Sequence, residues 1–143
     1  MADEMRDVRA LHAWRALARP TPAPERFSGP VSIHDLNEAS ERSELEVLAV
    51  FFEAGARTLP HTHTTGQLLY FLEGEGVVGT AGQTLLFRAG GMAYVEAGSW
   101  HWHGAIPTSG TCHLSIRPGG PSSWPPDVPM GNWETYLGGP RPD

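Results

Sequence analysis

Apolar positions recur along the middle of the chain in short runs that glycine- and proline-containing turns separate. Residues 45–52 (LEVLAVFF) are apolar on both parities except at Glu46. This run predicts a strand buried on both faces, although periodicity alone does not exclude a helix. Further strands are expected at residues 57–63, 67–73, 77–80, 84–88, 92–96, 100–106 and 111–117. Such regular spacing of short strands predicts an all-β fold, an antiparallel barrel or a jelly-roll sandwich.

The N-terminal part follows a different pattern. Val8, Leu11, Trp14 and Ala18 recur at three- and four-residue spacing, which predicts a short amphipathic helix within residues 6–19. The proline-rich stretch 20–24 is expected to end this helix and to form a stiff, extended linker. Residues 31–33 are a candidate for a short edge strand.

The C-terminal part changes character after Arg117. Seven of the 13 prolines lie there, together with Trp124, Trp133 and Tyr136. Large aromatic side chains are costly to leave in water, so the segment is either an arm packed on the barrel or on a partner, or a disordered tail. We expect a single domain, with a helix and linker at 1–30, the barrel at 31–117 and a Pro- and Trp-rich arm at 118–143.

Composition narrows the class of protein. With 143 residues, 40% of them apolar and 18% charged, the chain fits one globular domain. The net charge is -6 and all ten basic residues are arginines without a basic run, which argues against a nucleic-acid partner. Because lysine is absent, Schiff-base chemistry on a lysine is excluded.

Cys112 is the single cysteine, so no disulfide can form within the chain and we expect a small buried side chain. No apolar run reaches membrane-spanning length, and the first residues lack the apolar core of a secretory signal. The expected location is therefore cytoplasmic, without a membrane partner.

Candidate chemistry gathers on two histidine-rich stretches, His61-Thr62-His63-Thr64-Thr65-Gly66-Gln67 and Trp100-His101-Trp102-His103. Side chains two residues apart on a strand share a face, so each His-x-His pair points to one side. On residues 111–117, His113 shares a polar face with Thr111 and Ser115, which is typical of a cavity lining. A single histidine is more often a packing or surface residue, but two converging pairs predict a metal site.

The two stretches resemble the motifs of the cupin family. Residues 55–74 (GARTLPHTHTTGQLLYFLEG) match the spacing of the first motif, with Gln67 where the family pattern has glutamate. Residues 90–105 resemble the second motif, in which Gly90, Gly98 and His101 fit, whereas Glu96 and Ala105 replace its proline and asparagine. The resemblance covers residues 45–117 and implies a cupin-type antiparallel β-barrel, a double-sheet jelly roll.

The resemblance also implies a ligand set, His61, His63, Gln67 and His101, around one divalent metal. Gln67 together with the HWHGA stretch is similar to the small bacterial cupins that include the manganese-dependent hydroxynitrile lyases. Manganese is therefore the first expectation, followed by iron, nickel or zinc. By the same resemblance, His103 and His113 are the candidate catalytic residues.

Gln67 bears on the reaction class. Three imidazoles and an amide leave the metal's charge uncompensated, which favours Lewis-acid chemistry over oxidation of iron. We therefore expect a lyase or isomerase that acts on a small carbonyl-derived molecule. An iron-dependent dioxygenase and a non-catalytic cupin that binds a small ligand or a metal remain as alternatives. Small cupins commonly pair, so a homodimer is expected, with the Trp14 helix and the Trp-bearing arm as candidate interface elements.

Overall fold

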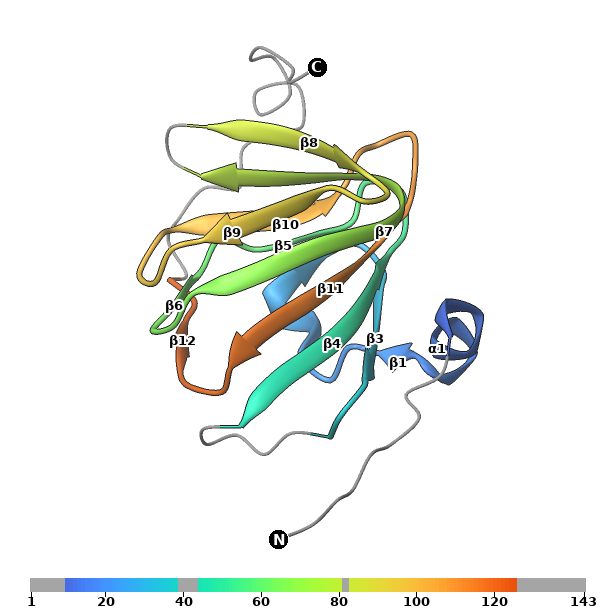
Figure 1. Cartoon of the computed structure of the whole chain (residues 1–143). Coiled ribbons are helices and arrows are strands. Elements are labelled where there is room, and N and C mark those ends of the chain that lie inside the picture. Colours follow the sequence, from blue (N-terminus) through green and yellow to red (C-terminus); the bar gives the residue numbers. More distant parts are fainter. Residues whose placement is uncertain (1–9, 39–43, 81–82, 126–143) are drawn as a thin grey trace, which may run out of the picture.

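The computed structural model describes residues 10–38, 44–80 and 83–125, and most of them lie in one curled antiparallel sheet that forms a half-barrel (Figure 1). One short helix precedes it, α1 (Leu11–Leu17). The strands are β1 (Arg19–Pro20), β2 (Phe27–Ser28), β3 (Val31–Asp35), β4 (Leu45–Phe52), β5 (Arg57–Thr58), β6 (Thr62–His63), β7 (Gln67–Thr80), β8 (Thr84–Arg88), β9 (Met92–Val95), β10 (His101–Ala105), β11 (Thr111–Pro118) and β12 (Ser122–Ser123). The predicted all-β jelly roll is confirmed.

The long strand β7 holds the two halves of the sheet together. Its first half pairs with β11 and β9, and its second half pairs with β10 and β8. The prediction of two strands at 67–73 and 77–80 was wrong because Gly74 bends the strand without ending it. Gly74 has φ +71° and pairs with Thr111 of β11, and the register with β11 shifts close by, between Cys112 and His113.

The prediction of one strand over residues 57–63 was also wrong. The structure has two short strands, β5 and β6, and His61 between them makes only an isolated bridge to His101. Pro60 has no N–H to donate to a ladder, which explains the interruption. Strand β6 pairs instead with β12, which comes from the segment after the barrel.

The N-terminal segment contributes to the sheet. Helix α1 begins at Leu11, and residues 6–9 of the predicted helix lie outside the described residues. The proposed linker at residues 20–24 is not a free extended segment, because Pro20 belongs to the short edge strand β1 that pairs with β3, and Pro24 begins the 3₁₀-helix η1 (Pro24–Arg26). Strand β3 therefore lies between β1 and β4, and its prediction as an edge strand was wrong.

Two apolar clusters fill the interior on either side of the histidines. One contains Val31, Val50, Phe52, Ala56 and Ala105, and the other contains Leu69, Phe71, Val78 and Val95. Strand β4 has the predicted bounds and supplies buried residues on both parities, although Leu45 at its start is 51% exposed. Cys112 is buried as expected, and burial raises the pKa of its thiol to about 12.

Strand β10 carries histidines on one face and a large ring on the other. Trp102, between His101 and His103, is only 1% exposed and pairs with Gly79 of β7. A side chain at Gly79 would overlap the Trp102 indole, so the glycine provides the room for this ring. No helix among the described residues has the length and the apolar character needed to cross a membrane.

Candidate metal centre

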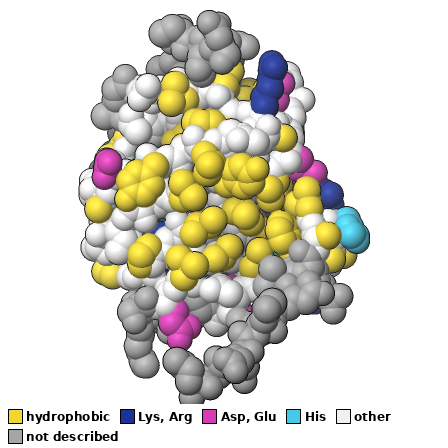
Figure 2. All heavy atoms as spheres, in the orientation of Figure 1, with side chains coloured by type: hydrophobic (Ala, Val, Ile, Leu, Met, Phe, Trp, Pro, Cys, Tyr) yellow, Lys and Arg dark blue, Asp and Glu magenta, His cyan; other side chains and the backbone are white. Residues whose placement is uncertain are grey.

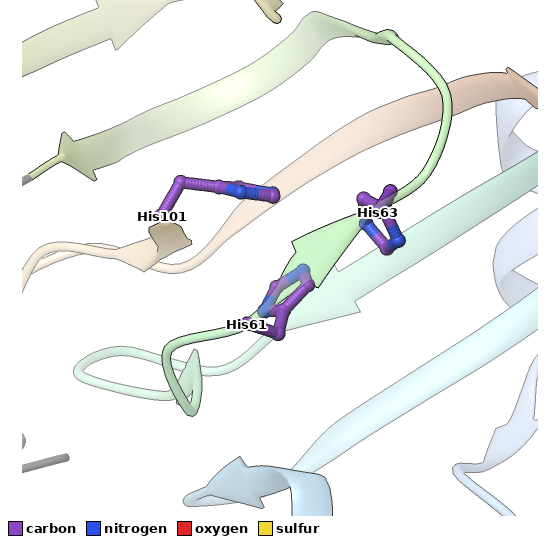
Figure 3. Close-up of side chains that lie close together, drawn as sticks. All are labelled: His61, His63 and His101. Atoms are coloured by element: carbon purple, nitrogen blue, oxygen red, sulfur yellow. The ribbon is translucent and has the colours of Figure 1, made fainter. Parts of the chain in front are cut away.

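Three buried histidines converge inside the half-barrel: His61, His63 and His101 (Figure 3). Each offers one ring nitrogen, and these three atoms all lie within 4.8 Å of one another. His61 and His63 come from the segment around β6, and His101 comes from the first position of β10. The two histidine-rich stretches thus face one another, as the sequence predicted.

Backbone pairing explains why His61 and His101 meet. The N–H of His61 donates to the carbonyl of His101 at 2.9 Å, and the N–H of His101 donates back at 3.0 Å. Directly opposed residues of antiparallel strands point to the same face, and the two ring centroids lie 4.3 Å apart. His63 follows His61 by two residues and therefore reaches the same side.

Hydrogen bonds at Nδ1 fix the rings. Nδ1 of His61 donates to the carbonyl of Leu59 at 2.8 Å, and Nδ1 of His101 donates to the carbonyl of Ser99 at 2.9 Å. Nδ1 of His63 is hydrogen-bonded to the hydroxyl of Ser122 at 2.6 Å. This pattern leaves Nε2 of each ring as the candidate metal-binding atom.

Gln67 stands beside this cluster with its amide held in one orientation. Its Nε2 donates to the hydroxyl of Ser115 at 2.8 Å, so its Oε1 points the other way and lies 3.0 Å from Nε2 of His101. The carbonyl oxygen of the amide is the atom that binds a hard cation. Its position is compatible with the ligand role that the resemblance implied.

Burial keeps the three imidazoles neutral. Burial, with a smaller contribution from His101, lowers the pKa of His61 to about 2. Burial, followed by the positive charge of Arg117, lowers the pKa of His63 to about 3. Burial also lowers the pKa of His101 below its usual value. Neutral imidazole is the form that binds metal, so the ligand set is in its binding form at pH 7.

The residues present fit a divalent metal ion. Nε2 of His63 is buried and has no partner in hydrogen-bonding geometry among the described residues. A buried nitrogen without a hydrogen-bond partner lowers stability unless a ligand binds it. This nitrogen belongs to the three-histidine cluster. The donor set of imidazole nitrogens and an amide oxygen suits first-row divalent metals.

The two catalytic candidates form a pair beside the three-histidine cluster. Nδ1 of His103 lies 2.9 Å from Nε2 of His113. His113 is fully buried against Phe52 and Phe71, with ring centroids 5.2 Å from each. Burial lowers the pKa of His113 to about 4 and, with His113 adding to the effect, lowers the pKa of His103 well below its usual value.

A cavity of about 200 Å³ adjoins the histidines. Its polar wall includes His61, His63, Gln67 and His103, whereas His113 is not among the residues that line it. Its apolar lining includes Phe27, Ile33, Leu48 and Val50. Enzyme pockets commonly measure about 300–1,000 Å³, so this cavity suits a small molecule with an apolar part.

Two arginines lie beside the cavity. Arg26 and Arg117 line it, and Nε of Arg117 lies 3.4 Å from Oε1 of Glu46. The guanidinium of Arg57 instead lies over the Trp102 ring at 5.0 Å, and neither Arg57 nor Arg88 lines the cavity.

Sequence reasoning missed Ser122 and Trp124 as parts of the site. Ser122 contacts His63, and the Trp124 ring stacks on His61 with centroids 4.0 Å apart. Both belong to the segment expected to be an arm or a tail, and no spacing signal connects them with residues some 60 positions earlier. The described part of this segment packs on the barrel, whereas Trp133 and Tyr136 lie outside the described residues.

Comparison with known proteins identifies the family of the chain. Residues 48–117 match the family model described as "Cupin domain". The chain is 37% identical over 92 residues to an (R)-mandelonitrile lyase of Granulicella tundricola, which is 64% of this chain and 70% of that protein.

Solved structures share the fold. A cupin-like protein from Thermotoga maritima is 28% identical, with a TM-score of 0.70 over 80% of this chain and 90% of that one. The polyketide cyclase RemF from Streptomyces resistomycificus is 17% identical, with a TM-score of 0.68 over 92% of each chain, and shows likeness of fold alone.

Proposed function

The chain belongs to the cupin family, and on that premise we propose that it is a metal-dependent lyase acting on a small carbonyl-derived molecule, as hydroxynitrile lyases do. The observation that carries this proposal is the three-histidine cluster, of which His61 and His63 line a small cavity together with His103. The similarity to an (R)-mandelonitrile lyase supports a hydroxynitrile as the substrate class.

We propose that His61, His63, His101 and Gln67 hold the metal, with manganese as the first candidate. A divalent cation bound there supplies Lewis-acid stabilisation of the negative charge that develops on a substrate oxygen. The four protein ligands are neutral, so none of them reduces the charge of the cation. This favours stabilisation of an alkoxide over redox cycling of iron.

His103 is the proposed proton carrier. When Nδ1 of His103 donates its proton to Nε2 of His113, Nε2 of His103 is left as an acceptor at the cavity. This Nε2 is buried and has no hydrogen-bond partner among the described residues, so it is available to a substrate hydroxyl. His113 holds the tautomer and the orientation of His103 and does not itself reach the cavity.

In the proposed cleavage of a hydroxynitrile, His103 takes up one proton and returns it. Nε2 of His103 accepts the hydroxyl proton, and the electron pair left on oxygen forms the carbonyl π bond. The carbon–carbon bond to the nitrile breaks, and its electron pair leaves with cyanide. His103 passes the proton to cyanide, so the products are an aldehyde and hydrogen cyanide.

Metal analysis and an activity assay test the proposal together. Protein purified without added metal is analysed for its elements and then incubated with mandelonitrile while benzaldehyde, cyanide and dissolved oxygen are followed. Manganese, benzaldehyde release and no oxygen uptake are expected. Bound iron with oxygen uptake would establish a dioxygenase instead, and absence of both metal and turnover would favour a binding protein.

The His103→Ala variant tests the proton carrier. Loss of a general base costs about 10²- to 10⁴-fold in rate, so turnover should fall by at least about 100-fold while metal content stays unchanged. Loss of the metal from this variant would make His103 a ligand and would contradict the proposed role.

A further inference from the structure

The segment after β11 returns across the metal centre. Residues 118–124, which we call the strap, leave the barrel at the end of β11 and run along the first histidine stretch. Within the strap, β12 pairs with β6, so that Ser122 lies opposite His63 and Ser123 lies opposite Thr62. The Thr65 hydroxyl also donates to the carbonyl of Pro118 at 3.3 Å.

The strap supplies the hydrogen-bond partner of His63 Nδ1. The Nδ1 partners of the other two histidines are close to them in sequence. Nδ1 of His61 and Nδ1 of His101 each donate to the backbone carbonyl two residues earlier in the chain. The partner of His63 Nδ1 is the hydroxyl of Ser122, 59 residues later, at 2.6 Å. The orientation of His63 therefore depends on docking of the strap.

From these contacts we propose that Ser122 is a positioning residue of the metal centre. Its hydroxyl accepts the Nδ1 proton of His63 and so keeps Nε2 of that ring as the atom available to a metal. The inference rests on the proposed function and goes beyond it, because it makes the strap, which lies outside the two histidine stretches, a part of the site.

A second contact of the strap supports this role. The Trp124 ring stacks on His61 with an interplanar angle of 18°, and its neighbour Arg26 lies 5.2 Å from the Trp124 ring centre. The strap thus touches two of the three histidines, one through a hydroxyl and one through a ring. Trp124 also lines the cavity, so docking of the strap shapes the site as well as its ligands.

The two serines of β12 give a matched pair of variants. Ser122→Ala removes the hydroxyl on His63, and Ser123→Ala removes an exposed hydroxyl from the next position of the same strand. Each full-length protein is stripped of metal with a chelator and titrated with Mn²⁺ by calorimetry, and its metal-free fold is checked by circular dichroism. Loss of a hydrogen bond to a metal-binding histidine commonly weakens metal binding by about 10- to 100-fold.

We expect this loss for Ser122→Ala, an affinity within about twofold of wild type for Ser123→Ala, and rescue by Ser122→Thr, which keeps a hydroxyl. Equal Mn²⁺ affinity in wild type, Ser122→Ala and Ser123→Ala would overturn the inference and leave the proposed function standing. If Ser122→Ala fails to fold, a folded Ser122→Thr with weakened binding would overturn it. Absence of Mn²⁺ binding by the wild type would instead count against the proposed metal function.

Discussion

At the scale of single residues, the side chain that most affects the proposed chemistry is Gln67. Ser115 fixes its amide so that Oε1 lies toward His101, which places a neutral oxygen where the family pattern has a carboxylate. A cation bound by neutral ligands keeps its full charge, which strengthens its effect on a substrate oxygen but weakens its retention.

Replacement of Gln67 by glutamate should therefore tighten metal binding and slow the lyase reaction. We expect Mn²⁺ affinity to rise by about tenfold, which corresponds to about 1.4 kcal/mol, and turnover to fall by a similar factor. Calorimetric titration and benzaldehyde release measure the two effects. Gln83→Glu adds the same charge at an exposed position and should change neither. Unchanged affinity and activity in Gln67→Glu would refute the charge argument.

At the scale of elements, β10 places chemistry on one face and packing on the other. His101 and His103 point inward, and Trp102 between them is buried against Gly79 of the neighbouring strand. This contact keeps β10 close to β7. The packing of Trp102 therefore also affects the positions of His101 and His103.

The Gly79→Ala variant should consequently disturb both stability and the site. The added methyl group overlaps the indole, and overpacking of this kind costs about 1–3 kcal/mol. We expect the melting temperature to fall by about 3–10 °C, together with weaker Mn²⁺ binding. In the double variant Gly79→Ala/Trp102→Leu, the smaller side chain should relieve the overlap, and the two effects should be less than additive. Strict additivity would show that overlap with Trp102 is not the cause.

At the scale of the whole molecule, the buried histidines couple stability to pH. The folded-state pKa values of His61, His63 and His113, about 2, 3 and 4, lie below the usual 6.5 of an unfolded chain. The unfolded state therefore binds more protons than the folded state. The contribution of these histidines to the free energy of unfolding is complete above pH 6.5 and is lost as the pH falls toward 4.

Denaturant unfolding of the metal-free protein at pH 7.5, 6.5, 5.5 and 5.0 measures this coupling. The free energy of unfolding should stay level down to pH 6.5 and then fall by at least about 1.4 kcal/mol per pH unit. This slope is the contribution of one histidine that is protonated only in the unfolded state. Ordinary carboxyl groups titrate at lower pH, so the window from 6.5 to 5.0 reports mainly on histidine. A level curve down to pH 5.0 would contradict the neutral, buried state of these rings.

The outer face of the sheet is a candidate interface for a dimer. Two apolar rows cross four strands, one of Val47, Ile116, Leu68 and Tyr94 and the other of Ala49, Leu114, Tyr70 and Met92. Figure 2 shows hydrophobic side chains gathered on this side, and Tyr94 and Met92 are 61% and 57% exposed.

Strand spacing gives the two rows an area of roughly 260 Å², which is of the order of the largest apolar patch that monomers commonly expose. A stable dimer buries about 800 Å² on each partner, so an interface centred here would also take in neighbouring α1, whose Arg15 lies over Phe51. We expect a second copy of the chain to cover this face.

Light scattering at micromolar concentration should give twice the chain mass of 15.5 kDa. The double variant Met92→Glu/Tyr94→Glu should shift the protein to the monomer, because two like charges would be buried opposite their copies. Gln83→Glu, which lies away from the two rows, should leave the dimer intact. A monomeric wild type would refute the expectation.

The sequence by itself predicted the fold class and the two histidine pairs, because both depend on local periodicity, whereas the choice of His61, His63 and His101 as one cluster came from the resemblance to the cupin motifs. Alternation along a strand puts His61 with His63 and His101 with His103, and the polar face of His113 and Ser115 follows from the same rule. Turn residues were less decisive, since Gly74 bends β7 without ending it and Pro60 divides one expected strand into two.

Only the tertiary structure showed which of His103 and His113 lines the cavity and which residues distant in sequence complete the site. It places His103 at the cavity and His113 behind it, although both carry the same side chain on inward-facing positions. It also brings Ser122 to His63 across 59 residues, a contact that arises because the strap pairs with β6. Such pairing depends on how the sheet curls, and no periodicity within either segment encodes it.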